Sequence, residues 1–141
     1  MRLDHIGIAT PDLDAAEALL ARLLGRTAYK RETVAEQHVT TSFFDAAAQE
    51  AKLEFVAPEG EQGPIQKFLQ KRGPGLHHLA FEVDDIQAEM KRLADDGFEL
   101  LQQAPSHGAD NKLVCFLHPR STNGVLVEIC QSKSSADSPN P

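Results

Sequence analysis

The stretch GLHHLAFEVDDI (residues 75–86) decides the fold, because nearly the same pattern occurs earlier in the chain as LDHIGIATPDL (residues 3–13). When His5 is placed on His78, at an offset of 73 residues, the aspartates that follow the two apolar runs also align. Each copy is a histidine, then a run typical of a strand, then an aspartate of the kind that caps a helix. The chain is therefore predicted to contain an internal duplication.

The rest of the chain predicts the same order of elements twice. The first module, residues 2–57, is predicted as a strand over 2–9, a helix over 13–24, and strands over 27–33, 36–44 and 51–57. The second, residues 76–131, is predicted as a strand over 76–83, a helix from a cap at Asp84 or Asp85 to Ala94, and strands over 98–102, 112–117 and 125–130. The connections are a linker over 58–75 with a short helix over 65–71, a loop over 105–111 and a disordered tail over 132–141.

This duplicated order predicts an α+β fold in one domain, residues 1–131. Two βαβββ modules paired edge to edge would form a curved, mixed eight-stranded sheet with the helices outside. The concave side of such a sheet is the natural position for a pocket.

Composition and charge limit the function. A net charge of −7 argues against nucleic acid and anionic membranes as partners, because both require a basic face. No apolar run is long enough to span a membrane, and the first residues show no signal-peptide pattern. Cys115 and Cys130 both lie in strand-like apolar runs, which predicts reduced core cysteines of a cytoplasmic protein. A disulfide across neighbouring strands is the alternative.

Each module also ends with a single glutamate inside an apolar strand. Glu54 follows His5 by 49 residues, and Glu128 follows His78 by 50 residues. If a local two-fold axis relates the modules, these four side chains would converge on one point. Two imidazoles and two carboxylates suit Zn²⁺, Co²⁺, Ni²⁺, Mn²⁺ or Fe²⁺, and four ligands leave two positions of a six-coordinate ion for a chelating substrate.

Taken singly, each of these residues has a simpler interpretation. A lone histidine in a strand is more often a core or surface residue, and a lone glutamate often faces solvent. His77 competes with His78, but neighbouring strand residues point to opposite faces, so only one can be a ligand. The repeat selects His78 and leaves His77, which aligns with Asp4, outside the ligand set. Three histidines have no counterpart in the repeat and are interpreted as loop or surface residues: His38, His107 and His118.

Together, residues 3–9, 75–86 and 118–128, with the run FLQKR (residues 68–72), resemble the methylmalonyl-CoA epimerases. That family belongs to the vicinal oxygen chelate superfamily, as does glyoxalase I. The resemblance runs from about Arg2 to Gln131, and it implies a paired βαβββ fold. It also implies a divalent metal ion (Co²⁺, Zn²⁺, Ni²⁺ or Mn²⁺) with this ligand set: His5, Glu54, His78 and Glu128.

The activity implied by the resemblance is that of an isomerase interconverting (2R)- and (2S)-methylmalonyl-CoA. A base removes the α-proton, a metal-stabilised enolate forms, and a proton returns to the other face. Glu128 is expected to be one base. Some family members have a second catalytic glutamate in the strand that matches residues 37–44, where this chain has Thr41, with Glu36 just before that strand. Glu54 is therefore predicted to act as the second base.

The resemblance also implies an acyl-CoA substrate, and a homodimer is expected. Five cations are candidates for binding the CoA phosphates: Lys67, Lys71, Arg72, Lys112 and Arg120. Three alternatives remain: a lactoylglutathione lyase like glyoxalase I, a non-enzymatic binding or resistance protein of the same fold, and an epimerase of another 2-carboxyacyl-CoA such as ethylmalonyl-CoA. The residues leave open which metal is bound, which base is the second, and whether the site lies within one chain.

Overall fold

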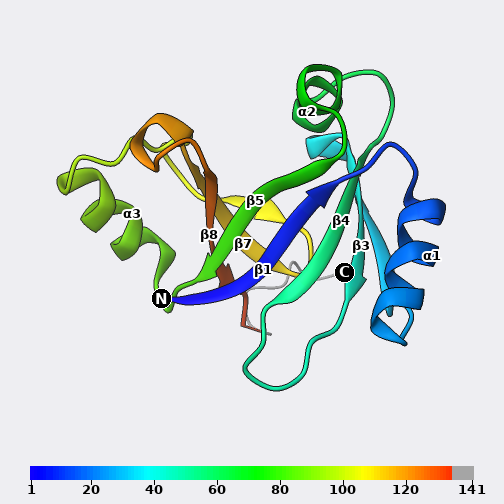
Figure 1. Ribbon diagram of the computed structural model, residues 1–141. Coiled ribbons are helices and arrows are strands. Elements are labelled where there is room, and N and C mark those ends of the chain that lie inside the picture. Colours follow the sequence, from blue (N-terminus) through cyan, green and yellow to red (C-terminus); the bar gives the residue numbers. More distant parts are fainter. Residues whose placement is uncertain (135–141) are drawn as a thin grey trace. The chain divides into compact units, whose positions relative to one another are not determined.

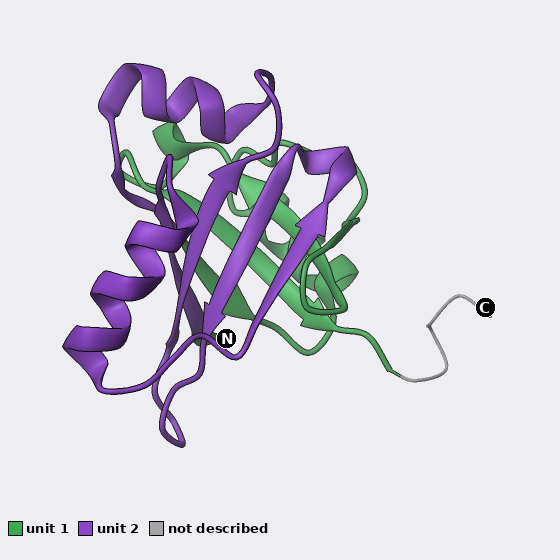
Figure 2. Cartoon of the chain, turned by 90° about the vertical axis from the view of Figure 1, so that its right-hand side faces the viewer, with its two compact units in different colours: residues 1–3, 79–141 green, residues 4–78 purple. Residues whose placement is uncertain are grey.

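The computed structural model describes residues 1–134 and consists of two compact units (Figure 2). The first unit along the chain comprises residues 4–78 (purple, "unit 2" in the key of Figure 2), and the second unit comprises residues 1–3 and the chain from residue 79 (green, "unit 1" in that key). The helices are α1 (Leu13–Leu24), α2 (Pro64–Arg72) and α3 (Ile86–Asp95). The strands are β1 (Arg2–Ala9), β2 (Lys30–Val34), β3 (Val39–Phe44), β4 (Lys52–Pro58), β5 (Gly75–Glu82), β6 (Ser106–Gly108), β7 (Lys112–Leu117) and β8 (Leu126–Ser132), and the short 3₁₀ turns are η1 (Ala35–Gln37) and η2 (Pro119–Ser121).

In the unit of residues 4–78, four strands follow the order β2-β3-β4-β1 (Figure 1). β1 pairs with β4 in parallel, and β4, β3 and β2 pair antiparallel. The helix α1 covers one face of these strands, where Leu20 packs with Phe44 and Phe55. The opposite face carries Phe43 and Glu54, which are register partners on β3 and β4. The helix therefore leaves the face with Glu54 for other contacts.

The second unit repeats this arrangement with β8, β7 and β6 pairing antiparallel. Three residues of α3 are buried against Cys115, Leu117 and Ile129 of β7 and β8: Ile86, Met90 and Leu93. Glu128 precedes Ile129 and so points to the face of β8 opposite α3. In each unit the helix thus packs against one face of the sheet, and the alternation of strand side chains directs the glutamate to the other face.

The helix α1 begins and ends where the sequence predicts, and α3 ends at Asp95, one residue after its predicted end. Asp12 caps α1 by accepting a hydrogen bond from the Ala15 amide at 3.1 Å, and Gly25 ends it with φ at 71°. At the start of α3, the cap is Asp85 and not Asp84: its side chain accepts from the Ala88 amide at 3.1 Å. In the described residues, no helix is long and apolar enough to cross a membrane.

The predicted strand over residues 98–102 is wrong. This segment makes only one isolated bridge, from Leu100 to Leu117, and the second strand of the second module is instead β6. Asp110 and Asn111 both have positive φ, which allows the tight turn that pairs β6 with β7. The side-chain oxygen of Gln102 accepts the Phe116 amide at 2.9 Å, in place of a ladder bond.

Several further boundaries differ from the prediction by one to three residues. Residues 35–37 form the turn η1 and not the start of β3, and β2 begins at Lys30. β8 continues to Ser132, so the first residue of the predicted tail belongs to a strand. The tail from residue 135 onwards lies outside the described residues, and the proposed module boundaries at 2–57 and 76–131 stay predictions.

Candidate metal centre

Three of the four predicted ligands lie together in the unit of residues 4–78. His5, Glu54 and His78 each present one ligand atom, and these atoms lie within 4.8 Å of one another. The Nε2 atom of His5 is 3.2 Å from Glu54 Oε2 and 3.2 Å from His78 Nε2. All three residues are buried. The repeat in the sequence therefore selected residues that meet in space, although they come from three strands.

Strand register explains how the three side chains come together. Gly7 of β1 is the register partner of Glu54 on β4, and His5 lies two residues before it on the same face. A Cβ atom on Gly7 would lie 2.0 Å from Cε1 of His78. The imidazole of His78 therefore occupies the space that any larger side chain at position 7 would fill, and only glycine allows the ring to reach His5 and Glu54.

The donor set fits a divalent transition metal ion. Two imidazole nitrogens and a carboxylate oxygen suit Zn²⁺, Co²⁺, Ni²⁺, Mn²⁺ or Fe²⁺. The carboxylate of Glu54 is buried, and a buried carboxylate is costly unless a cation or several donors neutralise it. Two imidazole Nε2 atoms only 3.2 Å apart also require a proton or a cation between them. A cation bound by His5, Glu54 and His78 would satisfy both requirements.

Each of the two histidines is contacted on its other ring nitrogen by the residue just before it. Asp4 Oδ2 is 2.7 Å from His5 Nδ1, and His77 Nδ1 is 2.9 Å from His78 Nδ1. The ring of Phe68 lies edge-on to His77, with centroids 4.9 Å apart. Burial lowers the pKa of His77 to about 4, so this imidazole is neutral near pH 7. Asp4 and His77 are outside the convergent ligand set, as predicted.

Their contact with the ligands was nevertheless missed by the sequence reasoning. The alternation of strand side chains assigned Asp4 and His77 to the far face and thus to no role. The available signal was their alignment in the repeat, because each stands immediately before a predicted ligand. A polar residue repeated at the position before a ligand indicates a partner for that ligand's second nitrogen.

The fourth predicted ligand, Glu128, lies on β8 in the other unit. It is buried, and its register partner on β7 is Phe116. Glu54 has the equivalent partner, Phe43 of β3. The two glutamates therefore have matching positions in their own units, and the participation of Glu128 in the metal centre stays a prediction.

Thr41 lies on β3, about where the family resemblance implies a second catalytic glutamate in some members. Thr41 is buried and is the register partner of Val56, two residues after Glu54 and on the same face of the sheet. Glu36, the nearest preceding carboxylate in the sequence, lies in η1 and is exposed. A threonine hydroxyl is no base at neutral pH, and the carboxylates on this face are Glu54 of β4 and Glu32 of β2, which is the register partner of Thr41.

The remaining histidines lie outside this cluster. His38, which follows η1, and His107 of β6 are both exposed. His118 caps η2, where its Nδ1 accepts the Arg120 amide at 3.1 Å. In the part of the chain that the structure describes, only His5 and His78 belong to a group of potential metal ligands.

The five predicted cations differ in their surroundings. Lys112 is buried, with Nζ 3.6 Å from Glu82 Oε2, and Arg120 pairs with Glu99. Lys67 and Lys71 are exposed on α2, and the guanidinium of Arg72 lies 5.9 Å from the ring centroid of Phe68. The α2 cations are thus better placed than Lys112 and Arg120 to meet a phosphate from solvent.

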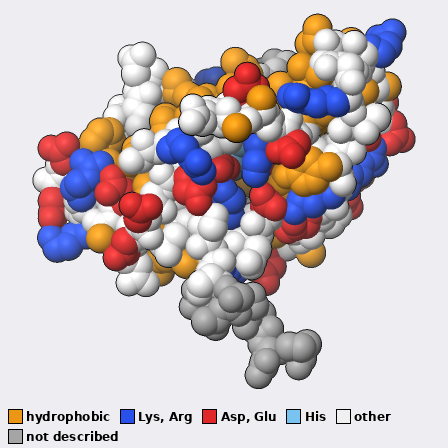
Figure 3. Space-filling model, turned by 90° about the horizontal axis from the view of Figure 1, so that it is seen from below, with side chains coloured by type: hydrophobic (Ala, Val, Ile, Leu, Met, Phe, Trp, Pro, Cys, Tyr) orange, Lys and Arg blue, Asp and Glu red, His pale blue; other side chains and the backbone are white. Residues whose placement is uncertain are grey.

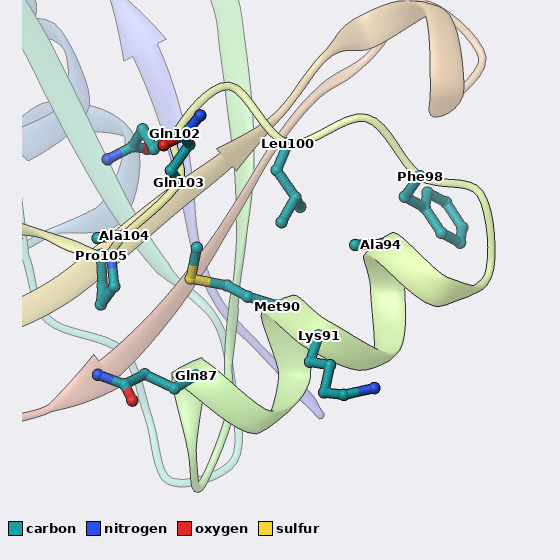
Figure 4. A pocket seen from close by; sticks show the side chains of 10 residues that line it. All are labelled: Gln87, Met90, Lys91, Ala94, Phe98, Leu100, Gln102, Gln103, Ala104 and Pro105. Carbon is teal, nitrogen blue, oxygen red and sulfur yellow. The ribbon is translucent and has the colours of Figure 1, made fainter.

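The second unit contains a separate groove of about 650 Å³ (Figure 4). Its walls are α3, with Met90 and Lys91, and the segment from Phe98 to Pro105. The lining contains no histidine, cysteine or carboxylate, so it offers neither a metal ligand nor a base for proton transfer. Its position on the α3 side also places it on the face of β8 away from Glu128.

Comparison with known proteins agrees with this geometry. The family model of the Glyoxalase/Bleomycin resistance protein/Dioxygenase superfamily matches residues 4–116. The chain belongs to this superfamily. It is 40% identical to the ethylmalonyl-CoA/methylmalonyl-CoA epimerase of Cereibacter sphaeroides, over 92% of this chain and 97% of that protein. It is 38% identical to the mitochondrial methylmalonyl-CoA epimerase of Dictyostelium discoideum, over 91% of this chain and 76% of that protein.

A solved structure extends the likeness to the fold. Streptomyces coelicolor methylmalonyl-CoA epimerase in complex with 2-nitronate-propionyl-CoA superposes with a TM-score of 0.88 at 32% identity, covering 95% of this chain and 99% of that one. Within the superfamily, the chain therefore lies among the methylmalonyl-CoA epimerases. The fold class predicted from the two βαβββ modules is confirmed.

Proposed function

We propose that this chain is an isomerase that interconverts (2R)- and (2S)-methylmalonyl-CoA at a divalent metal ion. The observation that carries the proposal is the convergence of His5, Glu54 and His78 in a chain related to such epimerases over almost its whole length. Glu128 completes the proposed ligand set. When bound there, the metal ion would supply a Lewis acid for the negative charge that develops as the α-proton leaves.

The chain's own carboxylates are the proposed bases. Epimerisation requires one base for each face of the α-carbon, within hydrogen-bond reach of the proton. Glu54 is proposed for one face, because β3 provides Thr41 in place of a glutamate. Glu128 is proposed for the other, since it occupies the matching position opposite a phenylalanine in the second unit. Each glutamate would accept the α-proton from one epimer. In the reverse direction the same glutamate would donate a proton to the deprotonated substrate and form that epimer again.

The proposed substrate is an acyl-CoA, and the three cations of α2 are the proposed contacts for its phosphates: Lys67, Lys71 and Arg72. On the face of the molecule shown in Figure 3, lysine and arginine side chains alternate with aspartate and glutamate and form no continuous basic field. A nucleic acid partner would require such a field. Local cations next to a metal centre suffice for a single small anion.

The metal, the compartment and the assembly complete the proposal. Co²⁺, Zn²⁺, Ni²⁺ and Mn²⁺ are the candidate metal ions. Cys115 and Cys130 are both buried and neither forms a disulfide, which fits a reducing cytoplasm. A homodimer is proposed, and light scattering of the purified protein would measure its mass.

The first experiment follows deuterium uptake at C2. Metal-loaded protein is incubated in D₂O with (2R)- or (2S)-methylmalonyl-CoA, and mass spectrometry measures the uptake. We expect uptake that disappears with a chelator and in His78→Ala, and that persists in His107→Ala, the matched replacement of an exposed histidine. No uptake by protein with metal demonstrably bound would contradict the proposal. A glutathione hemithioacetal and ethylmalonyl-CoA would then be tested with the same protein.

A further inference from the structure

The contacts behind the two histidines carry an inference about how the metal centre is prepared. An imidazole has two ring nitrogens, and the nitrogen that binds a metal ion must be free of its proton. The proton then resides on the other nitrogen, whose hydrogen-bond partner selects that tautomer. For His5 and His78 the inward nitrogen is Nε2, because these two atoms lie 3.2 Å apart beside Glu54.

The hydrogen bond between His5 and Asp4 can have only one direction. The carboxylate of Asp4 can only accept, so His5 donates from Nδ1 across the 2.7 Å separation. This hydrogen bond places a proton on Nδ1 and leaves the lone pair of Nε2 directed at His78 and Glu54. Asp4 and His5 are both buried, so the hydrogen bond does not compete with bulk water.

The partner of His78 admits two arrangements, and ligation selects one. The Nδ1 atoms of His77 and His78 are 2.9 Å apart and share one proton. If His77 donated, His78 would carry its own proton on Nε2 and could not bind a metal ion. His78 must therefore donate from Nδ1, and His77 accepts. Phe68 packs edge-on against His77 and holds the accepting ring in place.

We infer that Asp4 and His77 are positioning residues that set the tautomers of the two histidine ligands, and that Asp4 makes His5 the stronger ligand. The two partners differ in charge: a carboxylate stands behind His5, and an uncharged ring stands behind His78. A carboxylate that accepts the Nδ1 proton increases the electron density on Nε2 more than an uncharged acceptor does. The inference rests on the metal centre of the proposed function, and it concerns residues that do not touch the metal.

The test begins with the unaltered protein. Long-range ¹H–¹⁵N correlation spectra of the zinc-loaded, ¹⁵N-labelled protein report which ring nitrogen of each histidine carries the proton. We expect protons on Nδ1 of His5 and His78 and on Nε2 of His77. A proton on Nε2 of His77 together with one on Nδ1 of His78 cannot arise if His77 is the donor. Any other pattern in the zinc-bound protein overturns the inference, and no variant is needed for this result.

Zinc affinity, measured by competition with a chromophoric chelator, then compares the two partners. Asp4→Asn keeps an accepting oxygen and removes the charge, and we expect its affinity to fall about tenfold or more. His77→Leu removes the acceptor, and we expect a smaller loss, of about threefold to tenfold. His77→Asn places an amide oxygen near the position of Nδ1 and should restore most of the affinity. A merely structural role would not be rescued in this way.

Two controls separate this inference from the metal centre itself. Asp84→Asn and His107→Leu make similar replacements at exposed positions and should leave the affinity unchanged. Affinity within twofold of the unaltered protein in both Asp4→Asn and His77→Leu would overturn the inference and leave the proposed function standing. Failure of the unaltered protein to bind any of Zn²⁺, Co²⁺, Ni²⁺ and Mn²⁺ would overturn the proposed function as well.

Discussion

The two copies of the strand–helix unit agree in backbone and differ in the side chains that surround the ligands. Both helices start from an aspartate cap with the same 3.1 Å hydrogen bond. Both strand glutamates lie opposite a phenylalanine, Phe43 for Glu54 and Phe116 for Glu128. Phe43 and Phe116 are separated by 73 residues, the same offset as the two histidines. The duplication has therefore preserved the geometry that directs each glutamate away from its helix.

The difference lies in β3 and β7. The buried segment Thr40-Thr41-Ser42 of β3 is matched, at the offset of 73, by Leu113-Val114-Cys115 of β7. Hydroxyls buried in the first unit have carboxylate partners: Thr40 donates to Glu59, and Ser42 donates to Glu17. Leu113 and Cys115, the counterparts of Thr40 and Ser42, pack into the apolar cluster against α3. The same strand arrangement thus accommodates polar side chains in β3 and apolar side chains in β7, provided that each buried hydroxyl has an acceptor.

The strongest test of this comparison exchanges one glutamate at a time. In Glu54→Gln we expect epimerisation to fall about 10²- to 10⁴-fold, the usual loss of a general base. Deuterium exchange at C2 should persist for the one epimer that the remaining base still deprotonates, and Glu128→Gln should preserve exchange for the other epimer. Mass spectrometry and chiral analysis of the acyl group measure both. Full turnover of Glu54→Gln in both directions, with metal bound, would show that Glu54 is not a base.

A smaller but still large effect is expected at Gly7, whose counterpart in the second unit is Ala80. Gly7→Ala places a methyl group where the His78 ring lies, so we expect zinc affinity to fall by more than about 100-fold, beyond the loss from altering a ligand's partner. Isothermal titration would measure it. In the control Gly25→Ala, the added carbon has no atom within 4 Å. Because Gly25 has a positive φ, this replacement should cost about 1 kcal/mol of stability and leave the zinc affinity unchanged. Equal affinities of Gly7→Ala and the unaltered protein would contradict the packing argument.

The buried hydroxyls of β3 are expected to affect the stability of the protein and not its metal affinity. Ser42→Ala removes the hydrogen bond to Glu17 and should lower the free energy of unfolding by about 1–2 kcal/mol. The counterpart Cys115→Ser introduces a hydroxyl into an apolar cluster and should cost about 1–3 kcal/mol. Urea unfolding measures both. If Cys115→Ser unfolded at a higher urea concentration than the unaltered protein, the second unit would also accommodate a polar side chain at this position.

The smallest expected effect is a pH dependence in the first unit. The hydrogen bond from Arg31 holds the pKa of Glu17 below its usual value of 4.5. The folded protein therefore binds this proton less readily than the unfolded chain. The resulting stability is fully present above pH 4.5 and is lost as the pH falls through the lowered pKa. In urea unfolding below pH 4.5, Glu17→Gln should show a shallower decline, and an unchanged slope would count against this pair.

Much of the fold and part of the site followed from the sequence, for identifiable reasons. The helices α1 and α3 were predictable because an aspartate cap and an apolar stripe coincide in each. The strand β6 was not, because three residues are too few for alternation to be visible, and its turn depends on Asp110 and Asn111 adopting positive φ. His5, Glu54 and His78 were found through the repeat, which carries spatial information that a single histidine lacks.

The contacts around these ligands required coordinates. The role of Gly7 depends on the approach of a ring from a residue far along the chain, and no local pattern encodes that approach. The contacts of Asp4 and His77 were obscured by the rule of strand alternation, which describes the direction of Cβ and not the reach of a long side chain. The interpretation of Thr41 depended on the family resemblance and not on the local sequence.

The parallel pairing of β1 with β4 has a consequence for biosynthesis. A chain emerges from the ribosome with its N-terminus first, yet β1 must wait for residues 52–58 before its parallel partner exists. His5 must wait longer still, for His78. Non-local pairings of this kind fold slowly, since a long loop must close before any contact forms. A nascent chain therefore presents separate histidines and no chelating centre, so metal capture would report that the first unit has finished folding.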